Sequence, residues 1–206
     1  MNIISYRQFG KRFFDVTLIL FTMPVLLPVI LIISLLTWAN LGRPILFAQL
    51  RPGKNGEPYR LYKFRTMTNA MDGRGKLLPD EARLTSFGAM LRSTSLDELP
   101  ELYNVIEGKM SLVGPRPLLI RYLDRYTPEQ MRRHDVRPGI TGWAQINGRN
   151  SLTWDEKFEL DLWYLDNLSF RLDIEVLWRT VLTVIRREGI QQEGHATVEE
   201  FKGRGM

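Results

Sequence analysis

The amino-acid sequence predicts an α+β protein that is embedded in a membrane by its N-terminal part. Three observations lead to this prediction. Residues Val16–Ala39 carry no charged side chain and consist mainly of Leu, Ile, Val and Phe. Two short segments, Ile45–Leu50 and Tyr59–Phe64, read as β-strands. Nearer the C-terminus, Trp154–Asn167 and Leu172–Arg187 read as amphipathic helices.

The chain length fits one domain with an appendage, because independent cores usually form at about 100 to 200 residues. We therefore expect residues 1–40 to hold a short surface helix and the membrane helix, and residues 41–206 to form the domain. Cysteine is absent and only two histidines occur, so any metal ion is expected to be a hard cation bound by oxygen. The net charge of +5 predicts attraction to nucleic acid, anionic membranes or phosphorylated substrates.

The apolar segment is long enough to cross a bilayer, at a rise of about 1.5 Å per residue against a core of about 30 Å. It lacks the small-residue cleavage site of a signal peptide. Pro24 and Pro28 interrupt it, and both of its flanks are basic. A helix broken at Met23-Pro24 would satisfy the positive-inside rule by returning to the side it entered. Proline kinks also occur in spanning helices, so the residues alone leave a re-entrant hairpin and a single span open.

Turn and cap residues predict the remaining elements. The segment Arg51–Pro58 is rich in Pro, Gly and Asn, which suits a hairpin turn. Gly108 is expected to end a helix, and Pro128 to begin one. The elements expected in chain order are a surface helix over Met1–Gly10, the membrane element over Lys11–Trp38, a polar loop over Met67–Arg83, helices over Leu84–Arg92, Glu98–Glu107 and Thr127–His134, and an irregular stretch over Arg137–Gly148.

Two adjacent carboxylates, Asp97 and Glu98, lie where a helix is expected to begin, because Pro100 fits only a first helical turn. Backbone amides at that position keep a carboxylate ionised and can hold an anion beside it. This arrangement suits an acid that attacks phosphorus. The alternative is a simple helix cap, since Ser95 and Glu98 have capping-box spacing.

Two stretches combine Gly, Pro and Arg in a way that disfavours helix and strand. Met110–Pro117 holds Arg116 between two prolines, and Arg137–Gly148 adds glycine amides and further donors. Arginines with restricted backbones and bare glycine amides make phosphate cradles, although either stretch alone could be ordinary loop. Lys63 adds a cation at the end of a predicted strand.

Two other polar groups allow more than one reading. Asp161 lies among apolar residues, so it either faces solvent or serves as a paired or metal-bound carboxylate. His134 and Asp135, beside two arginines, are expected to form a surface cluster rather than a ligand set.

Five ordered stretches of the chain resemble motifs of the bacterial sugar transferases. Within that family, the chain is most similar to the small monotopic phosphoglycosyl transferases of the PglC type. The resemblance extends from about residue 11 to residue 201. The stretches that carry it are Lys11–Asp15, Tyr62–Met67, Ser95–Pro100, Ser111–Pro117 and Arg137–Gly142.

The resemblance implies an enzyme that moves a sugar 1-phosphate from a UDP-sugar to polyprenyl (undecaprenyl) phosphate, releases UMP and uses Mg²⁺. It also implies a monotopic protein on the cytoplasmic face of the inner membrane, with a re-entrant membrane helix. With the residue patterns, this predicts a re-entrant helical hairpin, amphipathic interface helices and a small strand element around the active site, although the pattern of Leu172–Arg187 alone equally allows a helix that faces the core with a basic outer face. The family bends its membrane helix at a Ser-Pro pair. This chain has Met23-Pro24 instead, and Thr22 or Pro28 is expected to compensate for the missing hydroxyl.

By the same resemblance, Asp97 is the nucleophile that takes up the phosphosugar. Glu98 is expected to ligate Mg²⁺ or to orient the attack, and Asp161 to join it at the metal. The residues expected to bind substrate phosphates are Lys63, Arg92, Arg116 and Arg149.

The tail over residues 193–201 resembles the subgroup that uses N-acetylated deoxyamino sugars, so di-N-acetylbacillosamine is the first donor sugar expected. The alternative is a hexose 1-phosphate transferase that uses UDP-glucose or UDP-galactose. A noncatalytic protein with a nucleic-acid-binding domain is a rival of another class. Such a domain would carry a basic helix rich in base-reading side chains, which the sequence lacks, so nucleic acid is not an expected partner.

Overall fold

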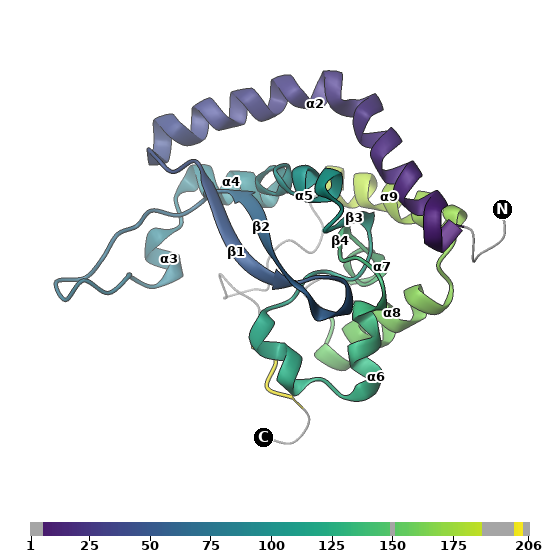
Figure 1. Ribbon diagram of the computed structural model, residues 1–206. Coiled ribbons are helices and arrows are strands. Elements are labelled where there is room, and N and C mark those ends of the chain that lie inside the picture. Colours follow the sequence, from purple (N-terminus) through teal and green to yellow (C-terminus); the bar gives the residue numbers. More distant parts are fainter. Residues whose placement is uncertain (1–5, 149–150, 187–199, 204–206) are drawn as a thin grey trace.

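The computed structural model describes residues 6–148, 151–186 and 200–203, and it has the mixed helix and strand content that was predicted. A long N-terminal helix arches over one side of the molecule, and the remaining elements lie beneath it (Figure 1). In chain order the elements are η1 (Tyr6–Gly10), α2 (Lys11–Leu41), β1 (Leu46–Pro52), η2 (Lys54–Gly56), β2 (Pro58–Phe64), α3 (Asp80–Arg83), α4 (Ser86–Ser93), η3 (Leu96–Glu98), α5 (Glu101–Glu107), β3 (Ser111–Val113), η4 (Ile120–Arg125), α6 (Pro128–Met131), η5 (Arg132–Asp135), β4 (Gly139–Thr141), α7 (Trp143–Ile146), α8 (Trp154–Asp166) and α9 (Phe170–Arg186).

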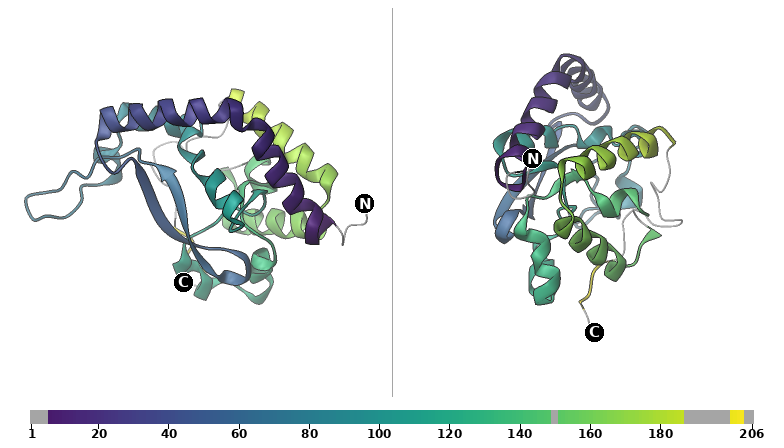
Figure 2. Two further views of the ribbon diagram at one scale, coloured as in Figure 1. Left: turned by 45° about the horizontal axis from the view of Figure 1, so that its top comes forward. Right: turned by 90° about the vertical axis from the view of Figure 1, so that its right-hand side faces the viewer.

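Helix α2 runs unbroken through Pro24 and Pro28, so the predicted break at Met23-Pro24 is wrong. The helix bends instead, and Figures 1 and 2 show an open arch with two arms rather than a closed hairpin. A proline removes one backbone hydrogen bond and bends a helix that its other bonds still hold together. The hydroxyl of Thr22 donates to the carbonyl of Leu18 at 2.8 Å, a contact that often accompanies helix bending.

The N-terminal arm of α2 is attached to the domain through buried polar contacts. Lys11 Nζ lies 2.5 Å from Asp173 Oδ2 in α9, and Tyr6 donates its hydroxyl to the same oxygen at 2.6 Å. Asp15 accepts the hydroxyl hydrogen bond of Ser111 at 2.7 Å. Tyr6 is therefore buried, whereas Arg7 and Phe9 in the same turn are exposed, so the described part of the predicted surface helix over Met1–Gly10 lies at the surface with one buried anchor.

The C-terminal arm of α2 contacts the same domain. Ile33 packs with Phe64 of β2 and Leu91 of α4 in a small buried cluster. The guanidinium of Arg65 donates to the carbonyl of Leu41, where α2 ends. Both ends of α2 are thus attached to the folded domain.

The outer face of α2 is apolar and exposed. The helix has a mean hydropathy of 2.8 in its most apolar window, and its length and composition would allow it to cross a membrane. Among the described residues it is the one helix with that property. Its exposed large apolar side chains are Phe13, Leu20, Phe21, Val25, Leu27, Leu31, Ile32, Leu35, Leu36 and Trp38.

The predicted hairpin is confirmed, because β1 and β2 pair antiparallel with Phe47 opposite Lys63. A second small sheet was not predicted: β3 and β4 pair in parallel, so the stretch Arg137–Gly148 is not wholly irregular. Gly139 makes this pairing possible, because a Cβ at that position would lie 2.1 Å from the backbone nitrogen of Gly114.

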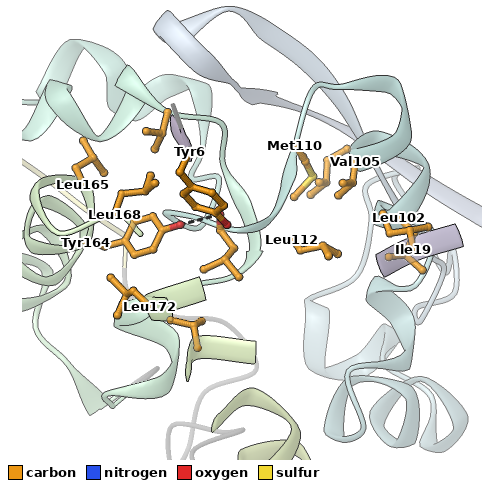
Figure 3. Packing of buried hydrophobic residues seen from close by; sticks show 14 of the residues in the cluster. Tyr6, Ile19, Leu102, Val105, Met110, Leu112, Tyr164, Leu165, Leu168 and Leu172 are labelled. Atoms are coloured by element: carbon orange, nitrogen blue, oxygen red, sulfur yellow. Dashed lines mark hydrogen bonds between the residues drawn. The ribbon is translucent and has the colours of Figure 1, made fainter. Parts of the chain in front are cut away.

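The main core lies between the arch and the C-terminal helices. Figure 3 shows Tyr6 beside Tyr164 and Leu168 there, with Met110 and Leu112 from the β3 region in the same cluster.

The caps that bound the helices follow ordinary sequence rules. Thr153 and Glu156 form a complete capping box for α8, Thr127 and Gln130 form one for α6, and Gly108 ends α5 in the left-handed conformation as predicted.

Candidate active site

Asp97 and Glu98 lie in the short turn η3, between α4 and α5. Ser95 precedes them with φ at 55° and makes no side-chain capping bond, so the alternative of a capping box between Ser95 and Glu98 is wrong. Helix α5 begins only at Glu101, and Pro100 occupies its N-cap position. The pair of carboxylates therefore belongs to a tight turn before the helix and is not consumed in capping it.

Two cations hold Glu98. Lys63 Nζ lies 2.6 Å from Glu98 Oε1, and Arg116 Nη2 lies 2.7 Å from the same oxygen. Lys63 comes from the end of β2, and Arg116 from the loop after β3. The second oxygen of Glu98 takes part in neither contact.

A third carboxylate, Glu101, joins this cluster. Its Oε1 lies 3.1 Å from Lys63 Nζ, so Lys63 is shared by Glu98 and Glu101. Glu101 was not predicted from the sequence as a residue of the site. Its position three residues after Glu98, in a segment expected to be helical, was the available signal, because residues with that spacing are neighbours on a helix.

The three carboxylates differ in their electrostatics. Burial, followed by the charge of Glu98, raises the pKa of Asp97 to about 6 and that of Glu101 to about 7. Burial also acts to raise the pKa of Glu98, but Arg116 and Lys63 hold it well below its usual value. At neutral pH, Glu98 is therefore fully ionised and Asp97 mostly so.

Asp97 is buried, with 8% of its surface exposed. Within the described residues it forms no hydrogen bond or ion pair, and the charges of Lys63, Arg116 and Arg92 lower its pKa from nearby. Arg92, in the last turn of α4, is positioned by a 3.1 Å bond from its Nε to the hydroxyl of Thr66. A mostly ionised carboxylate that no cation neutralises directly, with three cations around it, can attack an electrophilic phosphorus atom.

Arg116 is fixed through its backbone while its side chain remains half exposed, at 49%. The carbonyls of Pro115, Arg116 and Pro117 each accept a hydrogen bond from a different element. The donors are the backbone nitrogen of Gly139 in β4, Nη2 of Arg133 in η5 and Nη1 of Arg51 in β1. The Gly-Pro-Arg-Pro stretch is therefore a rigid support for one guanidinium, as its sequence suggested.

Among the described residues, Asp161 pairs with Arg133 and not with Glu98 or the two cations that contact Glu98. Its Oδ2 accepts bonds from Arg133 Nε at 3.1 Å and Nη2 at 2.7 Å, and the two side chains are 5% and 3% exposed. Burial raises the pKa of Asp161, and Arg133 opposes that shift. Arg133 and His134 are both buried, which corrects the expectation of a surface cluster for these two residues, whereas Arg132 and Asp135 are exposed. Within the described residues, no group of three or more His, Asp or Glu side chains is arranged to hold a metal ion.

The stretch Arg137–Gly148 serves packing in the residues that can be seen. Arg137 Nε donates to the carbonyl of Gly108 at 2.7 Å, at the end of α5. A Cβ on Gly142 would lie 2.2 Å from the carbonyl oxygen of Gly114, so this glycine also permits close backbone approach. Arg149 and most of the tail over residues 193–201 lie outside the described residues.

Comparison with known proteins gives the same family that the motifs indicated. The family model described as "Bacterial sugar transferase" matches residues 6–187. The chain is 54% identical over 195 residues to the uncharacterized sugar transferase EpsL of Bacillus subtilis, covering 95% of this chain and 96% of that protein.

Two further relatives carry more specific names. The chain is 35% identical to the UDP-N-acetylgalactosamine-undecaprenyl-phosphate N-acetylgalactosaminephosphotransferase of Aeromonas hydrophila, over 86% of this chain and 44% of that protein. It is 37% identical to the UDP-glucose:undecaprenyl-phosphate glucose-1-phosphate transferase of Klebsiella pneumoniae, over 83% of this chain and 39% of that protein. The chain thus spans less than half the length of these two relatives and nearly all of the Bacillus protein.

Proposed function

The chain belongs to the bacterial sugar transferase family and is a transferase, and on this premise we propose that it moves a sugar 1-phosphate from a UDP-sugar to undecaprenyl phosphate. The observation that carries the proposal is the turn at Asp97 and Glu98. One carboxylate there is held by Lys63 and Arg116, while its neighbour is buried, mostly ionised and left without an ion-pair partner among the described residues.

In the proposed first step, a carboxylate oxygen of Asp97 attacks the phosphorus atom that carries the sugar. A bond forms between Asp97 and that phosphorus, and the diphosphate linkage breaks, so UMP leaves with the bonding electron pair. In the second step, an oxygen of undecaprenyl phosphate attacks the same phosphorus and releases Asp97 as a carboxylate. The product is undecaprenyl diphosphate sugar, and the two substrates react in turn at one site.

We assign the surrounding cations to the substrate phosphates. Lys63 from β2, Arg92 from α4 and Arg116 from the loop after β3 converge on the carboxylate pair. Fixed cations placed where negative charge builds up during phosphoryl transfer stabilise the transition state. Arg149 is a proposed fourth member on the strength of the motif alone.

We propose Glu98 as the protein's ligand to Mg²⁺. The donor set fits a hard cation: the second oxygen of Glu98 takes part in neither of its two ion pairs, and Asp97 is adjacent in the chain. Mg²⁺ commonly uses one or two carboxylates and completes its shell with water and substrate phosphates, so a preformed three-carboxylate site is not required. When bound, the ion would neutralise charge on the donor diphosphate.

Turnover is therefore expected to need a divalent, oxygen-loving cation. Excess chelator should abolish UMP release by the purified protein. Without the cation, the negative charges of Glu98 and the donor diphosphate would repel each other. Chelator saturated with Mg²⁺ beforehand is the control and should leave the rate unchanged. Full activity in excess free chelator would remove the metal from the mechanism.

We propose a monotopic attachment to the cytoplasmic face of the inner membrane. Lys11 at one end of α2 and Leu41 at the other both contact the same domain, although a spanning helix would place its ends on opposite sides of the bilayer. The exposed apolar face of α2 would enter the nearer leaflet. Helix α9 would lie at the interface, because exposed Phe170, Ile174 and Trp178 recur along it at every fourth position.

Topology can be tested with single cysteines in this cysteine-free chain. Ser5→Cys and Lys54→Cys flank α2, and both thiols should react with an impermeant maleimide only from the cytoplasmic side. Permeabilised membranes provide the control, in which both sites should react. Labelling of residue 5 from the periplasm would mean a spanning helix.

The donor sugar we propose is an N-acetylated deoxyamino sugar such as di-N-acetylbacillosamine, on the resemblance of the tail. A hexose is the second candidate, because the Klebsiella pneumoniae relative is named for UDP-glucose. UMP release should be measured with undecaprenyl phosphate and a panel of UDP-di-N-acetylbacillosamine, UDP-N-acetylgalactosamine, UDP-glucose and UDP-galactose. The first donor is expected to be fastest. A faster rate with a hexose would select the second candidate, and no UMP from any UDP-sugar would contradict the proposed function.

A further inference from the structure

We infer that Asp161 is a positioning residue that acts on the reaction through Arg133 and the backbone of Arg116, and that it is not a metal ligand. The inference rests on the proposed function, since Arg116 is assigned there to the substrate phosphates. It differs from the metal role that the sequence motif implied for Asp161.

We call the contacts that run from Asp161 through Arg133 to the backbone of Arg116 the relay. Its first part is a buried ion pair. Asp161 lies in α8 and Arg133 in η5, and both nitrogens Nε and Nη2 of Arg133 donate to one oxygen of Asp161. The guanidinium of Arg133 also lies 5.7 Å from the centre of the Phe158 ring. Phe158 precedes Asp161 in α8 by about one helical turn. Since both charges are almost wholly buried, the position of the Arg133 side chain is determined by Asp161.

The second part links Arg133 to the active site. Nη2 of Arg133 donates at 2.8 Å to the carbonyl of Arg116, in addition to its bond with Asp161. Pro115 and Pro117 have no backbone N–H, so Arg116 carries the single amide hydrogen of the Pro-Arg-Pro segment. Hydrogen bonds from other elements must therefore fix this segment mainly through its carbonyl oxygens. The orientation of that peptide determines where the Arg116 side chain leaves the backbone, and its guanidinium then reaches Glu98 at 2.7 Å.

A planar guanidinium suits this role because its nitrogens can bond to two acceptors in fixed directions. Lysine at residue 133 would keep the charge, but its side chain is one bond shorter than the path to Nη2 of Arg133 and has no second nitrogen in place of Nε, so it cannot hold Asp161 and the Arg116 carbonyl in the same geometry. Arg133→Lys therefore separates positioning from charge balance, and it keeps the test valid even if Asp161→Asn does not fold.

The chain offers a matched control on the same two elements. Arg132 in η5 pairs with Asp166 in α8 at 2.5 Å, but both side chains are largely exposed and Arg132 is next to, not in, the relay. Asp166→Asn removes an equivalent charge from the same helix without touching the Arg116 peptide. Exposed pairs of this kind contribute little, so kcat/KM should stay at the wild-type value.

The experiment measures UMP release, the Mg²⁺ concentration for half-maximal rate and thermal unfolding for each variant. We expect Asp161→Asn and Arg133→Lys to lower kcat/KM for the UDP-sugar by about tenfold to a hundredfold, because small misplacements of catalytic groups have effects of that size. The half-maximal Mg²⁺ concentration should not change. The double variant Asp161→Asn with Arg116→Ala should be no slower than Arg116→Ala alone, since both changes remove the same function.

Three results would overturn the inference. These are a large rise in the half-maximal Mg²⁺ concentration for Asp161→Asn, losses that multiply in the double variant, and a wild-type rate for folded Arg133→Lys. An inactive wild-type protein would instead count against the proposed function, so the two failures are distinguishable.

Discussion

Replacing Asp97 by asparagine is expected to leave a folded protein whose turnover is reduced by on the order of a thousandfold or more, because an amide is a poor nucleophile towards phosphorus. The change is nearly isosteric, and Asp97 has no ion-pair partner among the described residues whose loss would destabilise the fold. UMP release measures the rate, and thermal unfolding in detergent checks the fold.

A capping role predicts the opposite pattern. Asparagine caps helices about as well as aspartate, so a cap at Asp97 would lose about 1 kcal/mol or less and keep its rate. The structure already removes part of this alternative, because the Ser95 side chain makes no capping bond. Asp166→Asn is a suitable control for the chemical change itself, since Asp166 is exposed and distant in sequence. A folded Asp97→Asn protein with near-normal turnover would exclude Asp97 as the nucleophile.

The second large effect is expected for Glu98→Gln. Lys63 and Arg116 both contact one oxygen of this carboxylate, so the substitution leaves two partly buried cations without their shared counter-charge. We expect kcat to fall by about a hundredfold or more, the size of effect seen when a group that organises transition-state charge is removed. Glutamine can still accept one hydrogen bond, so some modification of Asp97 by the donor should remain.

Glu101→Gln separates this effect from a general loss of negative charge. Glu101 shares Lys63 with Glu98 but, among the described residues, forms no ion pair with Arg116, so its substitution should be milder than that of Glu98. Equal rates for wild type and Glu98→Gln would show that the ion pairs at Glu98 are structural only.

Much of the fold could be predicted because its signals are local. The apolar run that became α2, the hairpin around Arg51–Pro58 and the end of α5 at Gly108 each depend on a few neighbouring residues. The proline bend could not be distinguished from a break, because the outcome depends on the contacts made by both arms of α2. The strands β3 and β4 are three residues each, too short for an alternating pattern, and their close approach depends on glycines far apart in sequence.

The residues of the site also fall into two groups, those that local motifs identify and those whose role depends on partners far away in the sequence. Asp97, Glu98, Lys63 and Arg116 stand in recognisable motifs, and the structure brings them together. The partner of Asp161 lies 28 residues before it and belongs to a cluster of charges that reads as surface in sequence. Nothing local marks Arg133 as buried, because a charged residue becomes buried only where another element supplies the opposite charge.

The central claim is that Asp97 carries the phosphosugar between the two substrates, and trapping that species tests it most directly. The purified wild-type protein should be incubated with a UDP-sugar labelled in its sugar, in the absence of undecaprenyl phosphate. We predict that label becomes attached to the protein, that one UMP is released per active site, and that mass mapping places the adduct on Asp97. If no adduct can be trapped and the kinetics require both substrates to be bound together, the sugar phosphate is transferred directly and Asp97 is not the nucleophile.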